Sequence, residues 1–347
     1  MSLHKCKLGE LITQRREKNN DDSLPISGVS KDGLIPPKQQ EADTSLYNMF
    51  YRGDFIFNPA RMELNSIAYN DKYDKAICSS LYEVFYVHRT DLILPEFLAL
   101  IVKQDWFTRY CEFLGQGSAR EYCRFANISE IEIEFPDIDV QKKTVHCYNV
   151  IKRRIELKQQ INDNLDAQAE AIYKDIFVIN PSPDWATGTL KDLLTVKYGK
   201  DHKQLADGNI PLYGSGGIMR YVERALYEKE SVLVPRKGSL NNVLYVNKPF
   251  WSVDTMFYTE VKHDNVAKYV YYYIREKDLA GMDTGSAVPS MSAEIIHSMQ
   301  LFIPDNNTLD RFERILKPIF LYVETNTCEI EYLKALSQNM LTILSSR

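Results

Sequence analysis

Side chains that could bind a metal ion are scattered along this chain of 347 residues. The six cysteines stand at positions 6, 78, 111, 123, 147 and 328, and no two of them form the Cys-x-x-Cys pair typical of a zinc site. His146 and Cys147 are neighbours, but no further ligands follow at zinc spacing. We therefore predict no metal site, and we expect reduced thiols in a cytoplasmic protein.

Motifs for chemistry on nucleotides or nucleic acids are incomplete. The glycine-rich stretch 214–217 is not followed by the Lys-Ser/Thr pair of a phosphate-binding loop. Asn58-Pro59 is followed by Ala60-Arg61, where an amino-methyltransferase would have a second proline and an aromatic residue to hold a flipped base. No glycine-rich strand for S-adenosylmethionine stands out, and no Asp with Glu-x-Lys cluster of a metal nuclease does. A Ser or Cys nucleophile with a paired His stays open on spacing alone, but we predict a chain without catalytic residues.

The order of short motifs indicates an internal repeat. Gly117-Ser118-Ala119 recurs as Gly285-Ser286-Ala287, 168 residues later, and Phe135-Pro136-Asp137 corresponds to Ile303-Pro304-Asp305 at the same offset. The opening stretches 7–11 and 189–193 also match, at a larger offset, so loops of different length intervene. An ordered series of matches over most of the chain predicts two copies of one structural unit.

Each copy combines a mixed domain with a long helix. Short strand-like runs and turns, with one helix each near 95–114 and 265–277, predict α+β domains at residues 1–137 and 181–305. The aromatic run Tyr269–Tyr273 is expected to pack in the hydrophobic core of its domain rather than to form a base-stacking platform. Two spacer helices are predicted to follow, a central one at 138–180 and a C-terminal one at 306–347.

The apolar residues of both predicted helices repeat at coiled-coil spacing. We expect the two stripes to pack on each other, and the helices to run antiparallel if the domains lie at opposite ends, as a spacer of roughly 45–52 Å. Pro318 predicts that the regular part of the second helix begins near that residue. Asn326 and Ser337 interrupt the second stripe. The stripes comprise Ile151, Ile155, Ile161, Leu165, Ala169 and Ile172, and Leu316, Ile319, Val323, Ile330, Leu333, Met340 and Leu344.

Several motifs carry a resemblance to a known family. They are the stretches Gly53–Arg61, Ile210–Ile218, Val234–Ser239, Gly285–Pro289 and Asn164–Tyr173. Together with the repeat of domain and long helix, they make the chain similar to the specificity subunit of type I restriction–modification systems. The similarity covers nearly the whole sequence.

Two positions depart from the family's pattern. Gln141 fits the glutamine expected early in the first helix, whereas the second copy has Leu309-Asp310 near that place. Asn241-Asn242 replaces an expected glycine.

The resemblance implies a non-catalytic subunit that reads a bipartite DNA target. Each of the two target-recognition domains would read one half, and the helix pair would fix the gap between the halves. The expected partners are double-stranded DNA, two methyltransferase subunits and restriction–translocase subunits, with no membrane. S-adenosylmethionine, ATP and Mg²⁺ are expected on those partners and no cofactor on this chain. The alternatives are a coiled-coil adaptor without DNA contact, or an unrecognised nuclease or methyltransferase.

The charge of the chain limits how such a protein could bind DNA. Its formal net charge is −5, and none of the four predicted segments is strongly basic. A DNA-binding face must therefore be a local patch, with the acidic residues turned elsewhere. We expect weak DNA binding by the chain alone, because affinity would be shared with its partners.

Polar loop residues near the repeated motifs are the candidate DNA contacts. We expect a minority of them to touch DNA and the others to be solvated loop residues. In the first domain the candidates are Lys31, Asn58, Arg61, Asn65, Gln116, Ser118 and Arg120. In the second domain they are Tyr213, Ser215, Arg220, Arg236, Lys237, Ser239, Asn241 and Ser286.

Overall fold

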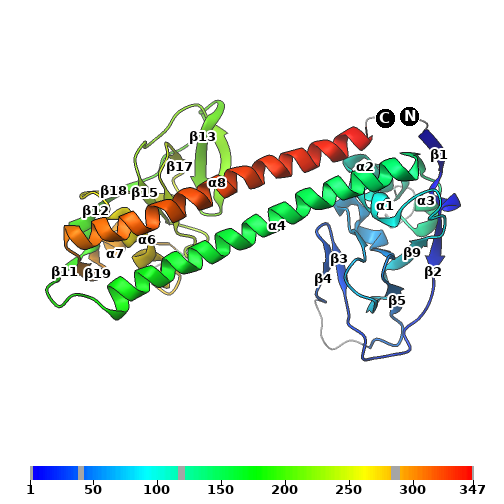
Figure 1. Ribbon diagram of the computed structural model, residues 1–347, viewed down its shortest axis with the longest axis horizontal. Coiled ribbons are helices and arrows are strands. Elements are labelled where there is room, and N and C mark those ends of the chain that lie inside the picture. Colours follow the sequence, from blue (N-terminus) through cyan, green and yellow to red (C-terminus); the bar gives the residue numbers. More distant parts are fainter. Residues whose placement is uncertain (1–2, 38–42, 116–121, 283–289, 346–347) are drawn as a thin grey trace. The chain divides into compact units, whose positions relative to one another are not determined.

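The computed structural model describes residues 3–37, 43–115, 122–282 and 290–345 (Figure 1). The chain divides into two compact units. Unit 1 comprises Met1–Gln159 with Thr327–Arg347, and unit 2 comprises Gln160–Asn326. Each unit contains one globular domain and parts of two long helices, α4 and α8 (Figure 1). Within the described ranges, no helix is both long and apolar enough to cross a membrane.

The first domain is built on a four-stranded antiparallel sheet with the order β2-β9-β6-β7. Two further antiparallel pairs, β3-β4 and β5-β8, and the pair β1-β10 complete its strands. The strands are β1 (Leu3–Lys7), β2 (Ile12–Arg15), β3 (Gly28–Ser30), β4 (Gly33–Ile35), β5 (Asn48–Tyr51), β6 (Phe55–Phe57), β7 (Ile67–Tyr69), β8 (Lys75–Cys78), β9 (Glu83–Val87) and β10 (Glu132–Pro136).

Short helices cover this sheet and bury its aromatic residues. Phe55 of β6 and Phe85 of β9 stack with ring centroids 4.9 Å apart, and Phe97 and Phe107 are buried in the same core. The helices are η1 (Leu8–Glu10), η2 (Pro59–Leu64), α1 (Pro95–Val102), α2 (Asp105–Gly115) and α3 (Phe125–Ser129). The single helix predicted near 95–114 is thus two helices, because the Gln104 carbonyl accepts the first amides of a new helix, from Phe107 and Thr108.

The second domain has the same sheet order with different strands. Its four-stranded sheet is β12-β18-β15-β16, and a smaller sheet has the order β14-β13-β17. The strands are β11 (Ala186–Thr189), β12 (Leu194–Tyr198), β13 (Asp207–Gly214), β14 (Gly217–Val222), β15 (Ser231–Pro235), β16 (Leu244–Val246), β17 (Trp251–Ser252), β18 (Met256–Val261) and β19 (Gln300–Ile303). The short helices are α5 (Leu190–Leu193), α6 (Ala267–Arg275) and α7 (Ala293–Ser298).

The repeat predicted from the sequence is confirmed by equivalent strands and hydrogen bonds. The pair β11-β19 corresponds to β1-β10, and both pairs are antiparallel. The Leu8 amide donates to the Ile131 carbonyl (2.9 Å), and the Leu190 amide donates to the Met299 carbonyl (3.0 Å). The two carbonyls are 168 residues apart in the sequence, the offset at which the motifs recur. The two domains are therefore copies of one α+β fold.

The long helices are α4 (Ile138–Lys174), which continues into a π-helical turn (Asp175–Ile179), and α8 (Asn306–Ser345). The expectation that α8 becomes regular only near Pro318 is wrong, because Pro318 lies inside the helix. A proline removes one backbone hydrogen bond, but the preceding turns are held by the buried side chains of Phe312 and Leu316. Asp305 caps the start of α8, since its Oδ1 accepts from the Thr308 amide (3.0 Å).

Both units show contacts between the two long helices. In unit 1, Glu329 of α8 lies 2.5 Å from the Arg154 guanidinium and 2.8 Å from the Lys158 ammonium of α4. The hydrogen bond from Lys158 lowers the pKa of Glu329.

In unit 2, the buried Asn326 amide donates to Asn162 Oδ1 (2.9 Å), and the rings of Tyr173 and Phe312 lie 6.4 Å apart. From Asn162 to Tyr173 along α4, the contacting residue of α8 moves back from Asn326 to Phe312. The two helices are therefore antiparallel in this unit, as predicted. Ile161, predicted on the stripe, is instead exposed, and the neighbouring Asn162 faces α8.

Gln141 fastens the start of α4 to the first domain. Its side chain is fully buried. Its Oε1 accepts from the Leu94 amide (2.9 Å), and its Nε2 donates to the carbonyls of Leu92 (2.8 Å) and Pro136 (2.7 Å). The equivalent residue of the second copy, Leu309, is buried in an apolar core.

Ion pairs connect the second domain to its long helices. Arg275 of α6 forms two hydrogen bonds to the Asp166 carboxylate, of 2.7 and 2.6 Å. The Lys268 ammonium is almost fully buried and lies between Glu313 of α8 (2.8 Å) and Glu230 (3.0 Å).

We predict that Gln141→Ala lowers the free energy of unfolding by about 1–3 kcal/mol, because it leaves buried backbone groups without partners. The measurement is equilibrium urea unfolding followed by circular dichroism. Lys143→Ala, an exposed neighbour on the same helix, should stay within about 0.5 kcal/mol of the parent. Equal stability of the two variants would contradict the role assigned to Gln141.

Candidate nucleic-acid interface

The same loop occurs in both domains between two strands of the main sheet. We call residues 58–66, between β6 and β7, the domain 1 loop, and residues 236–243, between β15 and β16, the domain 2 loop. The Cys123 amide donates to the Pro59 carbonyl (3.0 Å), and the Met291 amide donates to the Arg236 carbonyl (2.9 Å). Cys123 and Met291 are again 168 residues apart. The two loops are therefore equivalent positions of the repeat.

Two candidates in the domain 1 loop shape the loop itself. The Asn58 side chain accepts from the Ala60 amide (3.1 Å) and caps η2. Asn65 adopts the left-handed conformation (φ 52°), and its Nδ2 donates to the Val102 carbonyl (2.9 Å) and to Thr108 Oγ1 (2.5 Å). These hydrogen bonds hold the backbone of the loop, whereas the buried Asn65 Oδ1 has no hydrogen-bond partner among the described residues.

Arg61 is the exposed cation of the domain 1 loop. Among the residues that the structure describes, its side chain has no hydrogen bond or ion pair. An arginine on a loop whose backbone is fixed on both sides keeps its guanidinium available for an external acceptor.

Lys31 lies at the turn of the β3-β4 hairpin, and its side chain is exposed. Lys103 links the hairpin to the start of β7, directly after the domain 1 loop, because its Nζ donates to the carbonyls of Lys31 (2.7 Å) and Ile67 (3.1 Å). Burial lowers the pKa of Lys103. Reasoning from sequence missed Lys103, since nothing in its surroundings along the chain indicates this bridge.

In the second domain, Tyr213 and Arg220 stabilise the β13-β14 hairpin. Tyr213 packs against Phe250, with ring centroids 6.3 Å apart, and burial raises its pKa to about 12. Arg220 donates to the Asp207 carboxylate (2.9 Å) and to the carbonyls of His202 (2.8 Å) and Leu205 (3.0 Å). Arg220 therefore holds the segment before β13 against the hairpin.

The tip of this hairpin meets the domain 2 loop. Asn242 Nδ2 donates to the Ser215 carbonyl (2.8 Å). Sequence reasoning did not select Asn242 as a site residue, although it noted Asn241-Asn242 as a departure from the family's pattern. The contact joins two candidate segments into one surface.

Arg236 and Asn241 fix the two ends of the domain 2 loop. The Arg236 side chain donates to the Asp254 carbonyl (3.2 Å), and its guanidinium carbon lies 5.5 Å from the centre of the Tyr198 ring. Asn241 Oδ1 accepts from the Ala280 amide (3.1 Å). Lys237 and Ser239 lie between them, and both are exposed. The Lys237 side chain has no hydrogen bond or ion pair within the described ranges.

Four candidates fall outside the described residues: Gln116, Ser118, Arg120 and Ser286. They precede Cys123 and Met291, the residues whose amides hold the two loops. The contact of these four residues with DNA stays a prediction.

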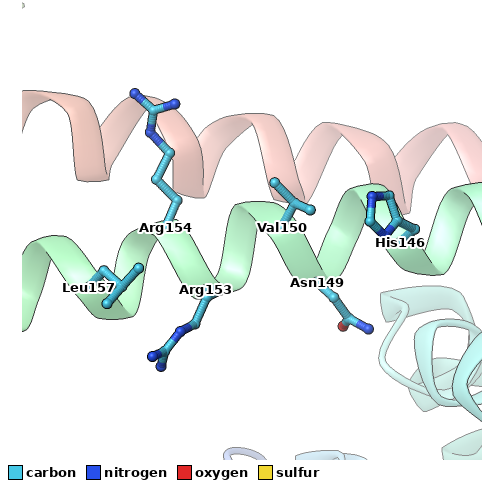
Figure 2. A pocket seen from close by; sticks show the side chains of 6 residues that line it. All are labelled: His146, Asn149, Val150, Arg153, Arg154 and Leu157. Atoms are coloured by element: carbon cyan, nitrogen blue, oxygen red, sulfur yellow. The ribbon is translucent and has the colours of Figure 1, made fainter.

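A surface hollow of about 440 Å³ lies along α4 in unit 1 (Figure 2). Figure 2 shows His146, Val150 and Arg154 on one side of the helix and Asn149 and Arg153 on the other. No carboxylate or cysteine lines this hollow, and it is open to solvent. In the described part of the chain, no group of three or more His, Cys, Asp or Glu side chains is arranged to hold a metal ion.

Comparisons with known proteins agree with this geometry. The family model for the type I restriction modification DNA specificity domain matches twice, at residues 15–167 and 183–335. The chain is 25% identical over 130 residues to the type I restriction enzyme HindI specificity subunit of Haemophilus influenzae, covering 37% of this chain and 28% of that protein. It is 20% identical over 294 residues to the MjaIX specificity subunit of Methanocaldococcus jannaschii, covering 72% of this chain and 68% of that protein.

The fold is that of a solved S subunit. The type I restriction-modification S subunit from M. genitalium superposes with a TM-score of 0.68 at 15% identity, covering 99% of this chain and 96% of that chain. The two matches of the family model, each covering one domain and part of a long helix, define a protein with two DNA specificity domains. The chain belongs to the family of type I restriction–modification specificity subunits, as the sequence resemblance predicted.

We predict that Arg220→Ala lowers the free energy of unfolding by about 1–3 kcal/mol, because the substitution removes the ion pair with Asp207 and the side-chain hydrogen bonds to the carbonyls of His202 and Leu205. Lys237→Ala in the same domain should change it by less than about 0.5 kcal/mol, because the Lys237 side chain is exposed. Thermal unfolding of both variants checks the difference. The assignment of Arg220 as a structural residue fails if both variants are as stable as the parent.

Proposed function

We propose that the chain reads a bipartite DNA target through the two equivalent loops and directs catalytic partner subunits to it. The observation that carries this proposal is the repeat of the site. Each domain holds its loop by the same backbone hydrogen bond, and each loop presents an exposed cation, Arg61 or Lys237. A surface that occurs twice in one chain suits a target read in two halves.

The side chains of the two loops suit contact with base edges and phosphates. Arginine and lysine donate to guanine and to phosphate oxygens, and asparagine and serine supply further hydrogen bonds. The loop backbones are pinned by Asn58, Asn65, Asn241 and Asn242, so the exposed side chains start from defined positions. Ordering a few free side chains costs less entropy than ordering a whole loop.

We propose that the chemistry is supplied by partners. The expected partners are two methyltransferase subunits and restriction–translocase subunits, which would bring S-adenosylmethionine, ATP and Mg²⁺. The net charge of −5 supports shared affinity, because a chain with this charge should bind DNA weakly alone. The chain itself would act without catalysis, by positioning.

We predict that Arg61→Ala and Lys237→Ala each alter one half of the target. A lost base contact should cost about 1–3 kcal/mol and relax one base position. Mapping methylated sites made by the complex assembled with each variant checks this. Arg61→Ala should affect only the half read by the first domain, and Lys237→Ala only the other half.

Lys5→Ala and Lys197→Ala are charge-matched controls. Lys5 lies near Glu132 (3.4 Å) and Lys197 near Glu260 (3.5 Å), so both lysines are already paired within their sheets. Neither control should change the target. If the two loop variants methylate the same sites with the same affinity as the parent, the proposed interface is wrong.

A further inference from the structure

The strand β14 presents apolar side chains to solvent beside the domain 2 loop. Ile218 is 51% exposed, Met219 is 58% exposed and Tyr221 is 50% exposed. The strand is at the edge of the sheet β14-β13-β17, and no other strand of the described residues pairs with it on that edge. Figure 1 shows β13 and its neighbour β17 at one end of the second domain, apart from β12 and β18.

A β-bulge sets the direction of Met219. Leu212 pairs with Arg220 and Tyr213 pairs with Ile218, so Met219 is an extra residue in β14 with no partner in β13. Bulges re-aim side chains and are common next to functional sites. The Met219 side chain lies over Gly214, because a Cβ added there would stand 2.5 Å from Met219 Sδ. A glycine at 214 therefore lets Met219 lie across the hairpin near its tip.

The hairpin tip and the domain 2 loop form a continuous surface. Asn242 holds the Ser215 carbonyl, and a Cβ added at Gly238 would stand 2.7 Å from Ser215 Oγ. The exposed Lys237 directly precedes Gly238. The hairpin that carries Ile218 and Met219 thus contacts the loop that carries Lys237, a cation suited to contact a phosphate.

This combination fits the major groove of duplex DNA. The groove admits a two-stranded β-ribbon, and the thymine C5-methyl is the apolar group that base pairs present there. We propose that the β13-β14 hairpin enters the major groove and that Ile218 and Met219 recognise a thymine by its methyl group. The inference rests on the proposed function and specifies how one base of the second half-target is read.

The test is a double-mutant cycle between side chain and methyl group. The half-target of the second domain is first defined by mapping methylated sites. Each thymine in it is then replaced by uracil, which removes only the methyl group. We expect the assembled complex to lose affinity about fourfold at one position, the effect of burying roughly one methyl group. With Met219→Ala or Ile218→Ala, that position should bind thymine and uracil equally.

Two controls separate a thymine contact from other effects. Met219→Leu keeps an apolar side chain of similar volume and should keep the discrimination. Uracil replacement in the half-target of the first domain should affect the parent and the Met219→Ala complex alike.

Three outcomes would overturn the inference. If the parent complex binds thymine and uracil equally at every position of the second half-target, the contact is excluded. Undiminished discrimination in both alanine variants also excludes it. A variant that weakens assembly with methyltransferase subunits, with discrimination intact, assigns the surface to a protein partner. If the parent complex methylates no defined bipartite sequence, that result instead rejects the proposed function.

Discussion

The buried Lys268 ammonium is the contact on which the second domain depends. A buried charge is costly unless it is paired and hydrogen-bonded. Here two carboxylates satisfy it, Glu313 from α8 and Glu230 from the residue before β15, and the rings of Tyr245 and Phe320 lie within 5.5 Å of it. Removing one partner of such a cluster typically costs about 3–5 kcal/mol. Helix α8 and the strand that leads into the domain 2 loop are therefore held in one arrangement.

The two copies reach the same attachment by different chemistry. The first copy uses a neutral amide, Gln141, which bonds three backbone groups. The second copy has Leu309 at that position and relies on Lys268 and on the pair of Arg275 with Asp166. At the position of the departure, Leu309 packs in the apolar core, and ion pairs join the second domain to both long helices.

Local patterns in the sequence were sufficient to predict the repeat, the α+β class and the long helices. The aromatic run Tyr269–Tyr273 was correctly predicted as core, since Tyr269, Tyr272 and Tyr273 are buried. The role of individual loop residues was not predictable. Asn65 is held by Val102 and Thr108, and Lys103 bridges Lys31 and Ile67. Such partners are distant along the chain, so residue type and spacing do not show which side chains are already engaged.

The hydrogen bond between Asn326 and Asn162 restricts how α4 and α8 can slide along each other. A shift of one turn would separate the two amides and break the hydrogen bond from the fully buried Asn326 side chain to Asn162. Apolar contacts alone tolerate such shifts, whereas a single polar pair in a helical seam specifies one register. Chimeras that join a long helix of this chain to one from a relative would therefore need to preserve this asparagine pair.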